Sequence, residues 1–306
     1  MSKLIMAKII SFLRNIKHLD INIRYLLIRN KMNKMCPKIV DENETVKLIK
    51  EQKLSVSRFG DGEFRWMTGI KNDSFQQNDI VLAERLKEIL NSNVYNHIVC
   101  IPNNLLTQQG YVTINALAWK MLLVNYWHIW LPILDKKKTF FDANFTRPYI
   151  DRRTKDDAKT KFENVKNIWE NKSVLIIEGE KTKFGVANDL LDNVKKIGRV
   201  ICPAINAFSK YDTILSEAMK IQENYDLILI ALGPTATVLS YDLAKNGCSQ
   251  SIDIGHLDIE YEWFRKGTMK RTPIPNKYVN EVTNGTNVTS HIENEKYSSE
   301  IKCIIR

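Results

Sequence analysis

Two carboxylates separated by one residue follow the first strong strand pattern of the chain. The segment Arg58-Phe-Gly-Asp-Gly-Glu63 places Asp61 and Glu63 on an extended stretch where both side chains can face the same way. Gly60 and Gly62 let the backbone bend closely around a ligand. Carboxylate oxygens suit Mg²⁺ or Mn²⁺, which keep several waters and bridge substrate phosphates, and Arg58 can pair with a diphosphate oxygen. An ordinary Asp-Gly turn would explain the same residues.

The densest group of titratable side chains follows a predicted strand that ends near residue 254. Five of them fall within ten positions, interleaved with aromatic residues: Asp253, His256, Asp258, Glu260 and Glu262. A solvated surface has no need of interleaved Tyr and Trp, and a structural core avoids four acids. Such a cluster can supply a general base, a stabiliser of the leaving group or further metal contacts. We therefore expect a functional site here.

Two further loops have features of phosphate sites. Gly179, Glu180 and Lys181 follow a buried strand and precede a predicted helix, whose free backbone N–H groups can cradle an anion. Gly233-Pro-Thr235 opens another helix in the same way. Neither loop has the Gly-X-Gly-X-X-Gly or P-loop spacing, so nicotinamide and Walker-type sites are not indicated. A plain strand-to-helix turn, or simple capping by Thr235, is the structural alternative.

Apolar strands that alternate with amphipathic helices must position these loops. We expect strands over 54–58, 97–102, 138–141, 173–177, 199–202, 225–232 and 251–254. We expect helices over 41–52, 79–90, 111–130, 185–196, 209–223 and 235–246, and a solvated, charged helix within 151–170. This alternation predicts an α/β fold: a Rossmann-like, doubly wound, mostly parallel sheet with helices on both faces. Ligands of such sheets bind beyond the carboxyl ends of the strands.

Residues 1–40 carry most of the positive charge of the chain. They hold nine Lys or Arg against one acid, Asp20, for a net charge of +8 out of a total of +10. The remaining body is close to neutral, which argues against a nucleic-acid partner. Apolar residues recur at helical spacing in this basic arm: Ile5, Ile9, Phe12, Leu13, Ile16 and Leu19. The stripe predicts either peripheral contact of residues 1–35 with an anionic membrane, or packing on the body or on a second subunit of a homo-oligomer.

Targeting and cysteine patterns indicate a cytoplasmic protein. Charged residues interrupt the first apolar run and no cleavage site follows it, so a secretory signal is not expected. Lys120 interrupts the apolar segment 114–134, which we expect to be a largely buried helix and not a membrane span. The five cysteines are scattered and odd in number, which favours reduced thiols. The prediction is a cytoplasmic body, with possible contact at the inner leaflet through the arm.

Four sequence blocks resemble the signature blocks of bacterial GT-D-type glycosyltransferases. They occur in the expected order within residues 41–282: Arg58–Glu63, Cys202-Pro-Ala-Ile-Asn-Ala-Phe208, Ala231–Leu239 and Asp253–Trp263. The resemblance implies a Rossmann-like glycosyltransferase domain with an Asp-X-Glu metal motif, a Mn²⁺ or Mg²⁺ ion and a UDP-sugar donor (UDP-glucose in a representative member). The arm, residues 1–40, and a polar, mobile tail, residues 283–306, lie outside it.

The resemblance also assigns roles residue by residue. Asp61 and Glu63 would hold the metal against the diphosphate, with Arg58 in support, and His256 and Glu262 would lie at the sugar end. Family members build bacterial surface glycans and protein-linked glycans, so the implied acceptor is a hydroxyl of a glycan, lipid-linked or protein-linked glycan. The transferred hexose would be glucose or galactose. None of the four blocks specifies the acceptor.

The leading hypothesis is a metal-dependent glycosyltransferase whose base is Glu262 or His256, with Glu260 and Asp258 as further candidates. Gly60, Gly179, Glu180, Lys181, Gly233, Thr235 and Asp253 complete the expected donor site. Another nucleotide-dependent Rossmann-like transferase, such as a methyltransferase, would need no Asp-X-Glu site. A non-catalytic adaptor that binds membranes or nucleic acid through the basic arm is the third hypothesis, but the near-neutral body and the acidic cluster argue against it.

Overall fold

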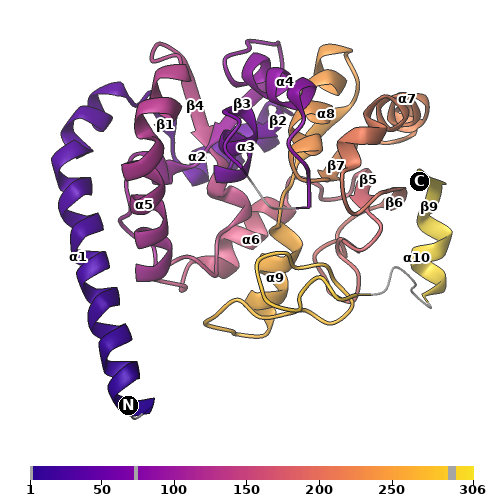
Figure 1. The fold of residues 1–306 in the computed structure, drawn as a ribbon. Coiled ribbons are helices and arrows are strands. Elements are labelled where there is room, and N and C mark those ends of the chain that lie inside the picture. The colour runs from indigo at the N-terminus through magenta and orange to yellow at the C-terminus, as the bar shows by residue number, and fades with distance from the viewer. Residues whose placement is uncertain (1–2, 72–74, 289–293) are drawn as a thin grey trace.

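A single parallel β-sheet organises the chain. The computed structural model describes residues 3–71, 75–288 and 294–306, and within them nine strands follow the order β1-β4-β3-β2-β8-β7-β5-β6-β9 (Figure 1). The strands are Lys38–Val40 (β1), Ser55–Arg58 (β2), His97–Ile101 (β3), Thr139–Asp142 (β4), Ser173–Gly179 (β5), Lys196–Cys202 (β6), Leu227–Ala231 (β7), Gln250–Asp253 (β8) and Ile301–Ile304 (β9). Every pairing between them is parallel, which confirms the predicted α/β fold.

Apolar side chains on both faces explain why these strands are central. In β5, Val174 and Ile176 join the core on one face, and Leu175 and Ile177 join the core on the other. A parallel strand that helices cover on both faces has a continuous apolar sequence, and β5 follows this rule. Helices Glu42–Glu51 (α2), Ala158–Lys166 (α6) and Leu257–Arg265 (α9) contribute to the first core. The sheet is therefore covered on both sides.

Other helices contribute to the cores on the second face of the sheet. These are Asp61–Met67 (α3), Ile80–Leu90 (α4), Thr113–Trp130 (α5), Tyr211–Ile221 (α7) and Pro234–Lys245 (α8). The prediction of a helix over 185–196 was wrong, because that segment forms a series of turns. Lys183, Gly185 and Ala187 all have positive φ, a conformation that an α-helix cannot contain.

The C-terminal residues differ from the predicted mobile tail. Glu295–Glu300 (α10) and the edge strand β9, which pairs with β6, are ordered parts of the fold. Arg199 on β6 explains the anchoring, since its Nε donates to Glu300 at 2.7 Å and its Nη1 donates to Glu178 at 2.6 Å. The polar composition of this segment suggested a mobile tail. A buried ion-pair cluster holds it in place instead. Residues 289–293 lie outside the described part of the chain.

The basic arm is a long helix, Lys3–Met35 (α1), that lies beside α5 and extends past its end (Figure 1). Tyr25 and Met32 pack in the same core cluster as Trp119 of α5. The two members of the predicted stripe whose side chains are described do not make this contact: Ile16 and Leu19 are 49% and 61% exposed. Ile5, Ile9, Phe12 and Leu13 have side chains outside the described set. Among the described residues, no helix has both the length and the apolar character needed to cross a bilayer.

Candidate active site

A cavity of about 430 Å³ opens at the carboxyl edge of the sheet. β2 and β8 are parallel neighbours, with Val56 paired to Ile252, so the loops that follow both strands meet at this edge. Arg58 ends β2 and Asp253 ends β8, and both line the cavity. The chain continues from β2 to β3 on one side, whereas β7 and β5 lie on the other, and ligands of doubly wound sheets bind at such a crevice. The volume is within the range of about 300–1,000 Å³ typical of ligand pockets.

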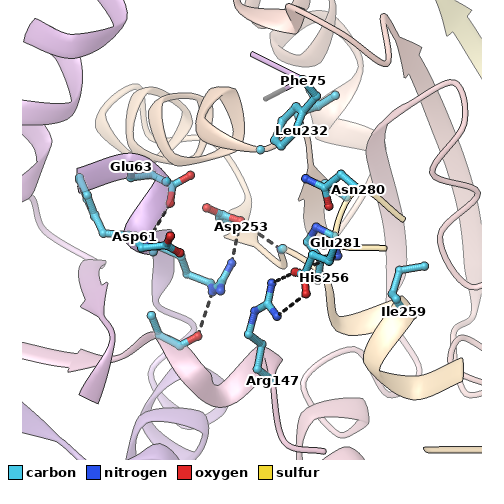
Figure 2. Close-up of a pocket in the computed structure, with 18 of the residues that line it drawn as sticks. Asp61, Glu63, Phe75, Arg147, Leu232, Asp253, His256, Ile259, Asn280 and Glu281 are labelled. Atoms are coloured by element: carbon cyan, nitrogen blue, oxygen red, sulfur yellow. Dashed lines mark hydrogen bonds and ion pairs between the residues drawn. The ribbon is translucent and has the colours of Figure 1, made fainter. Parts of the chain in front are cut away.

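The Asp-X-Glu pair lies in the first turn of α3 and not on the extended stretch that we predicted. Gly60 is the N-cap residue, and its backbone N–H donates to Glu63 Oε2 at 2.7 Å, which turns that carboxylate back toward the start of the helix. The Asp61 side chain is 52% exposed. Both carboxylates lie near Asp253 in the cavity (Figure 2). A short helix thus achieves the convergence that the one-residue spacing suggested.

Negative charge is concentrated at this point. Burial and the nearby Asp253 carboxylate raise the pKa of Glu63 to about 7, and burial also raises the pKa of Asp253. Arg58 opposes both shifts: its Nη1 lies 3.5 Å from Asp253 Oδ1, while its Nε donates to the Ala143 carbonyl at 3.1 Å. A site that disfavours several adjacent carboxylate charges is stabilised by a cation.

The donor set fits a partly hydrated divalent cation. Within the described residues, no three His, Cys, Asp or Glu side chains form a group that could hold a metal ion by themselves. Asp61 and Glu63 offer hard oxygen ligands that are accessible from the cavity. Mg²⁺ and Mn²⁺ sites of this kind take one or two carboxylates and complete their coordination with waters and substrate phosphates.

The two predicted phosphate loops contribute only in part. Gly179 and Gly233 line the cavity, whereas Glu180, Lys181 and Thr235 do not. Gly233 has φ +55° and is the N-cap of α8, so the N-terminus of a twelve-residue helix begins at the cavity wall. Thr235 is fully buried and makes no capping hydrogen bond, which excludes the capping role considered for it.

The acidic cluster at 253–262 divides into two sets. Asp253, His256 and Asp258 line the cavity, but Glu260 and Glu262 do not. Asp258 is engaged by Lys277, whose Nζ lies 2.6 Å from Oδ2, and by the Gly185 N–H at 3.0 Å.

The two glutamates of this cluster are held inside the protein. Glu262 Oε1 accepts from Asn188 at 2.7 Å and lies 3.5 Å from Lys277. Glu260 Oε2 accepts from the backbone N–H groups of Tyr149 and Ile150, and burial raises the pKa of Glu260 to about 7. Helix α9 therefore turns the two glutamates into the protein.

The imidazole ring of His256 lines the cavity. Burial, together with Arg147, Arg58 and Arg271, lowers its pKa to about 4 despite the opposing charge of Glu281, so the ring is neutral at pH 7. Nδ1 lies 3.9 Å from Glu281 Oε1 and has no hydrogen-bond partner in the described structure. A neutral ring nitrogen can accept a proton or a hydrogen bond from a ligand.

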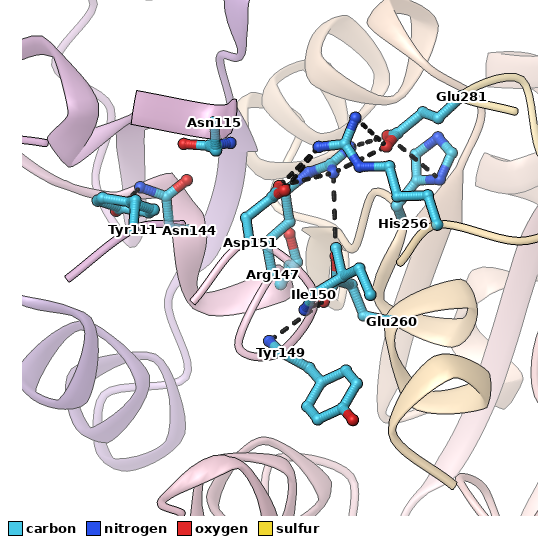
Figure 3. Close-up of polar contacts among 12 residues, drawn as sticks. Tyr111, Asn115, Asn144, Arg147, Tyr149, Ile150, Asp151, His256, Glu260 and Glu281 are labelled. Atoms are coloured by element: carbon cyan, nitrogen blue, oxygen red, sulfur yellow. Dashed lines mark hydrogen bonds and ion pairs between the residues drawn. The ribbon is translucent and has the colours of Figure 1, made fainter. Parts of the chain in front are cut away.

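A charged network that we did not predict lies next to His256 (Figure 3). Arg271 Nη2 donates to both Asp151 oxygens at 2.7 and 2.8 Å, and Arg147 forms a two-point pair with Glu281. The segment at 151 looked like a solvated helix face, and Asp151 was assigned to it. The sequence offered no signal for these residues, because their partners lie more than 100 positions away.

A neutral group on the other side of Arg58 was also missed. It consists of Asn104, Tyr111, Asn115, Trp119 and Asn144, all of which line the cavity. We had assigned 111–130 to a buried apolar helix. Isolated Asn residues give no periodic pattern, so only the fold brings these together.

Comparison with known proteins identifies the architecture. The family profile for the glycosyltransferase GT-D fold matches residues 56–282. The chain belongs to the GT-D glycosyltransferase family. It is 34% identical over 261 residues to the glycosyltransferase GlyD of Streptococcus pneumoniae serotype 4, and 32% identical over 265 residues to the probable glycosyl transferase Gly of Streptococcus gordonii. These alignments cover 85% and 86% of this chain but 31% and 38% of the relatives, so the chain spans about a third of their length.

Solved structures agree with this assignment. One is a highly conserved domain of unknown function 1792, described as having a distinct glycosyltransferase fold; it is 34% identical, with a TM-score of 0.83 over 90% of this chain and 98% of that one. Another is a glycosyltransferase of the same domain type from Streptococcus sanguinis, 31% identical, with a TM-score of 0.83 over 89% of this chain and all of that one. The predicted family and fold are confirmed.

Proposed function

We propose that the chain is a metal-dependent glycosyltransferase. It moves a hexose, glucose or galactose, from a UDP-sugar to a hydroxyl of a glycan, glycolipid or glycoprotein in the assembly of bacterial surface glycans. The observation that carries the proposal is the convergence of Asp61, Glu63 and Asp253 in one cavity, beside the N-terminus of α8. Family membership supports sugar transfer, and this geometry suits a donor that carries a diphosphate.

Mn²⁺ or Mg²⁺ would be held by Asp61 and Glu63. When bound, such an ion neutralises the charge that develops on the departing diphosphate. Arg58 keeps Asp253 paired and ends β2, and the metal ligands follow in the first turn of α3. Gly179 and Gly233 allow the backbone to approach the diphosphate on the β5–β7 side of the cavity.

The transfer requires a proton acceptor for the attacking hydroxyl. The hydroxyl oxygen bonds to the anomeric carbon, the bond from that carbon to the diphosphate oxygen breaks, UDP leaves with the electron pair, and the hydroxyl proton passes to the base. His256 suits this role because its neutral ring lines the cavity, while its buried Nδ1 lies 3.9 Å from Glu281. Asp258, Glu260 and Glu262 are less suitable because internal donors occupy them.

The test is UDP release from a panel of UDP-sugars, with Mn²⁺ and then with EDTA. The proposal predicts release from one UDP-hexose that stops when the metal is removed. Turnover that is indifferent to EDTA would instead favour another nucleotide-dependent transferase. No release, together with no binding of UDP in the presence of Mn²⁺, would overturn the donor assignment.

We also propose a cytoplasmic location with peripheral contact at an anionic membrane. The face of α1 opposite the packed residues Tyr25 and Met32 exposes a row of aliphatic side chains: Ile16, Leu19, Ile23, Leu26 and Leu27, each 49–78% exposed. The surrounding arm has a net charge of +8, which attracts anionic lipid and repels a second copy. Leu26→Glu with Leu27→Glu should abolish binding to phosphatidylglycerol vesicles. Unchanged vesicle binding would refute the contact, and a concentration-dependent dimer in solution would assign the row to self-association.

A further inference from the structure

We propose that the neutral group Asn104, Tyr111, Asn115, Trp119 and Asn144, here termed the amide wall, binds a sugar residue of the acceptor. The inference rests on the proposed function, because it assigns the part of the same cavity that the donor does not use. All five residues line the cavity, and none carries a charge. They come from the loops after β3 and β4 and from the first turns of α5.

The amide wall is a built structure and not a chance grouping of surface residues. Asn144 Nδ2 donates to Asn104 Oδ1 and to the Tyr111 hydroxyl, each at 2.9 Å, and Asn104 Nδ2 donates to Asn115 Oδ1 at 3.3 Å. The Asn104, Tyr111 and Asn144 side chains are at least nine-tenths buried. Burial and mutual hydrogen bonds fix the orientation of the groups before any ligand arrives, which lowers the ordering cost of binding.

The hydrogen-bonding capacity that remains is suited to hydroxyl groups. Within the described part of the chain, the Asn115 NH₂ group has no acceptor and the Tyr111 hydroxyl proton has none. Amides and phenols supply both donors and acceptors without charge, as a ring of hydroxyls requires. Trp119 adds an apolar indole surface in the same wall, able to cover the C–H face of a sugar ring.

Location separates the amide wall from the donor side of the cavity. The phosphate-type loops at Gly179 and Gly233 lie at the β5 and β7 ends, whereas the amide wall lies at the β3 and β4 ends, with Arg58 and Asp253 between. None of the five residues carries a charge, so the wall itself offers neutral hydrogen-bonding groups and no cation. Figure 3 shows Tyr111, Asn115 and Asn144 together, with Arg147 and Asp151 between them and His256. A glycan seated on the wall can therefore extend past Asp151 toward the proposed base.

The test is direct binding of simple glycosides. The probes are p-nitrophenyl hexosides and p-nitrophenyl N-acetylhexosaminides, measured by saturation-transfer NMR on the full chain. Asn115→Ala removes an unpaired donor from a half-buried position, and Asn125→Ala is the matched control, because Asn125 is exposed on the same helix. Loss of one hydrogen bond to a neutral ligand corresponds to about a fivefold weaker affinity. Tyr111→Phe should weaken binding by a similar factor.

We expect at least one glycoside to bind the wild-type chain, about five times more weakly to Asn115→Ala and equally well to Asn125→Ala. Affinity for UDP with Mn²⁺ should stay within twofold in Asn115→Ala. A tenfold loss of UDP affinity in that variant would assign the wall to the uracil base, and would overturn the inference. Absence of binding to every glycoside, or equal binding by Asn115→Ala, would also overturn it. Failure of the proposed function is seen separately, as absence of UDP release by the wild-type chain.

Discussion

Two acidic segments of this chain have similar composition but opposite surroundings. Asp61 and Glu63 begin a helix at the carboxyl edge of the sheet, and their carboxylates are accessible from the cavity. Asp258 and Glu262 lie on another helix, α9, that follows β8 at the same edge, yet Lys277 and Asn188 occupy them. The density of acidic residues in a sequence therefore does not identify a metal site. A metal site needs carboxylates that are not already occupied by internal donors, and only the fold shows which carboxylates are free in this way.

The largest difference between the two segments should appear in catalysis. Asp61→Ala is expected to lower UDP release from the donor at least a hundredfold, because it removes a ligand of the metal that stabilises the leaving group. The melting temperature should change little, since Asp61 is half exposed and its ion pair with Arg65 is 3.8 Å long. Full activity in this variant would remove the metal assignment. Equal loss of activity and of stability would point to a structural role.

Substitutions in the second segment should change the stability of the fold. Asp258→Ala leaves Lys277, which is 4% exposed, with only the longer contact to Glu262 among the described acidic side chains. It is expected to lower the free energy of unfolding by roughly 3 kcal/mol. Urea denaturation measures this change. The exposed acid Asp156 provides the control, because Asp156→Ala should be close to neutral. A stable Asp258→Ala protein that has lost turnover would show that this carboxylate acts in chemistry.

Glu260 gives a pH-dependent version of the same comparison. Its pKa is raised from 4.5 to about 7, so the folded state holds a proton that the unfolded state releases. The stability from this group is fully present below pH 4.5 and is lost as the pH rises through 7, which amounts to about 2 kcal/mol between pH 5 and pH 8. The glutamine side chain of the Glu260→Gln variant does not titrate. This variant should therefore lose that part of the pH dependence of the free energy of unfolding, measured by urea denaturation. The same pH dependence in wild type and variant would contradict the raised pKa.

The smallest effect is expected for Glu262→Gln. The glutamine oxygen can still accept from Asn188, and only the 3.5 Å contact with Lys277 is weakened, so stability should fall by less than about 1 kcal/mol. UDP release should stay within twofold of wild type. A hundredfold loss would return Glu262 to the role of base that the sequence suggested for it.

The sequence was sufficient for the fold because the parallel strands are apolar on both faces. β5 and β7 contain continuous runs of Ile, Leu and Val, and Gly179 at the end of β5 and Gly233 after β7 mark the loops at the cavity. β9 and α10 were missed because Arg199 and Glu300 hold them, and an ion pair between distant residues leaves no local pattern. The turns at 183–187 were missed because the sequence there has helical composition, while the backbone adopts positive φ.

The candidate site was predicted where its residues follow strands. Arg58, Asp61, Glu63, Asp253 and His256 were found this way, and the structure brings them together at the β2–β8 edge. The cluster at 253–262 could not be divided in advance, because Lys277 and Asn188 lie outside it in sequence. Asn104 and Asn144 come from separate loops, and only the tertiary structure brings Asn144 Nδ2 within 2.9 Å of Asn104 Oδ1.

The most direct test of the difference between the two segments is calorimetric titration of Mn²⁺ into the full chain with UDP present. Wild type and Glu262→Gln should bind Mn²⁺ with the same affinity, whereas Glu63→Gln, which keeps an acceptor for the Gly60 N–H, should lose it. Equal Mn²⁺ binding by Glu63→Gln, or its loss in Glu262→Gln, would contradict the assignment of the metal to the first segment.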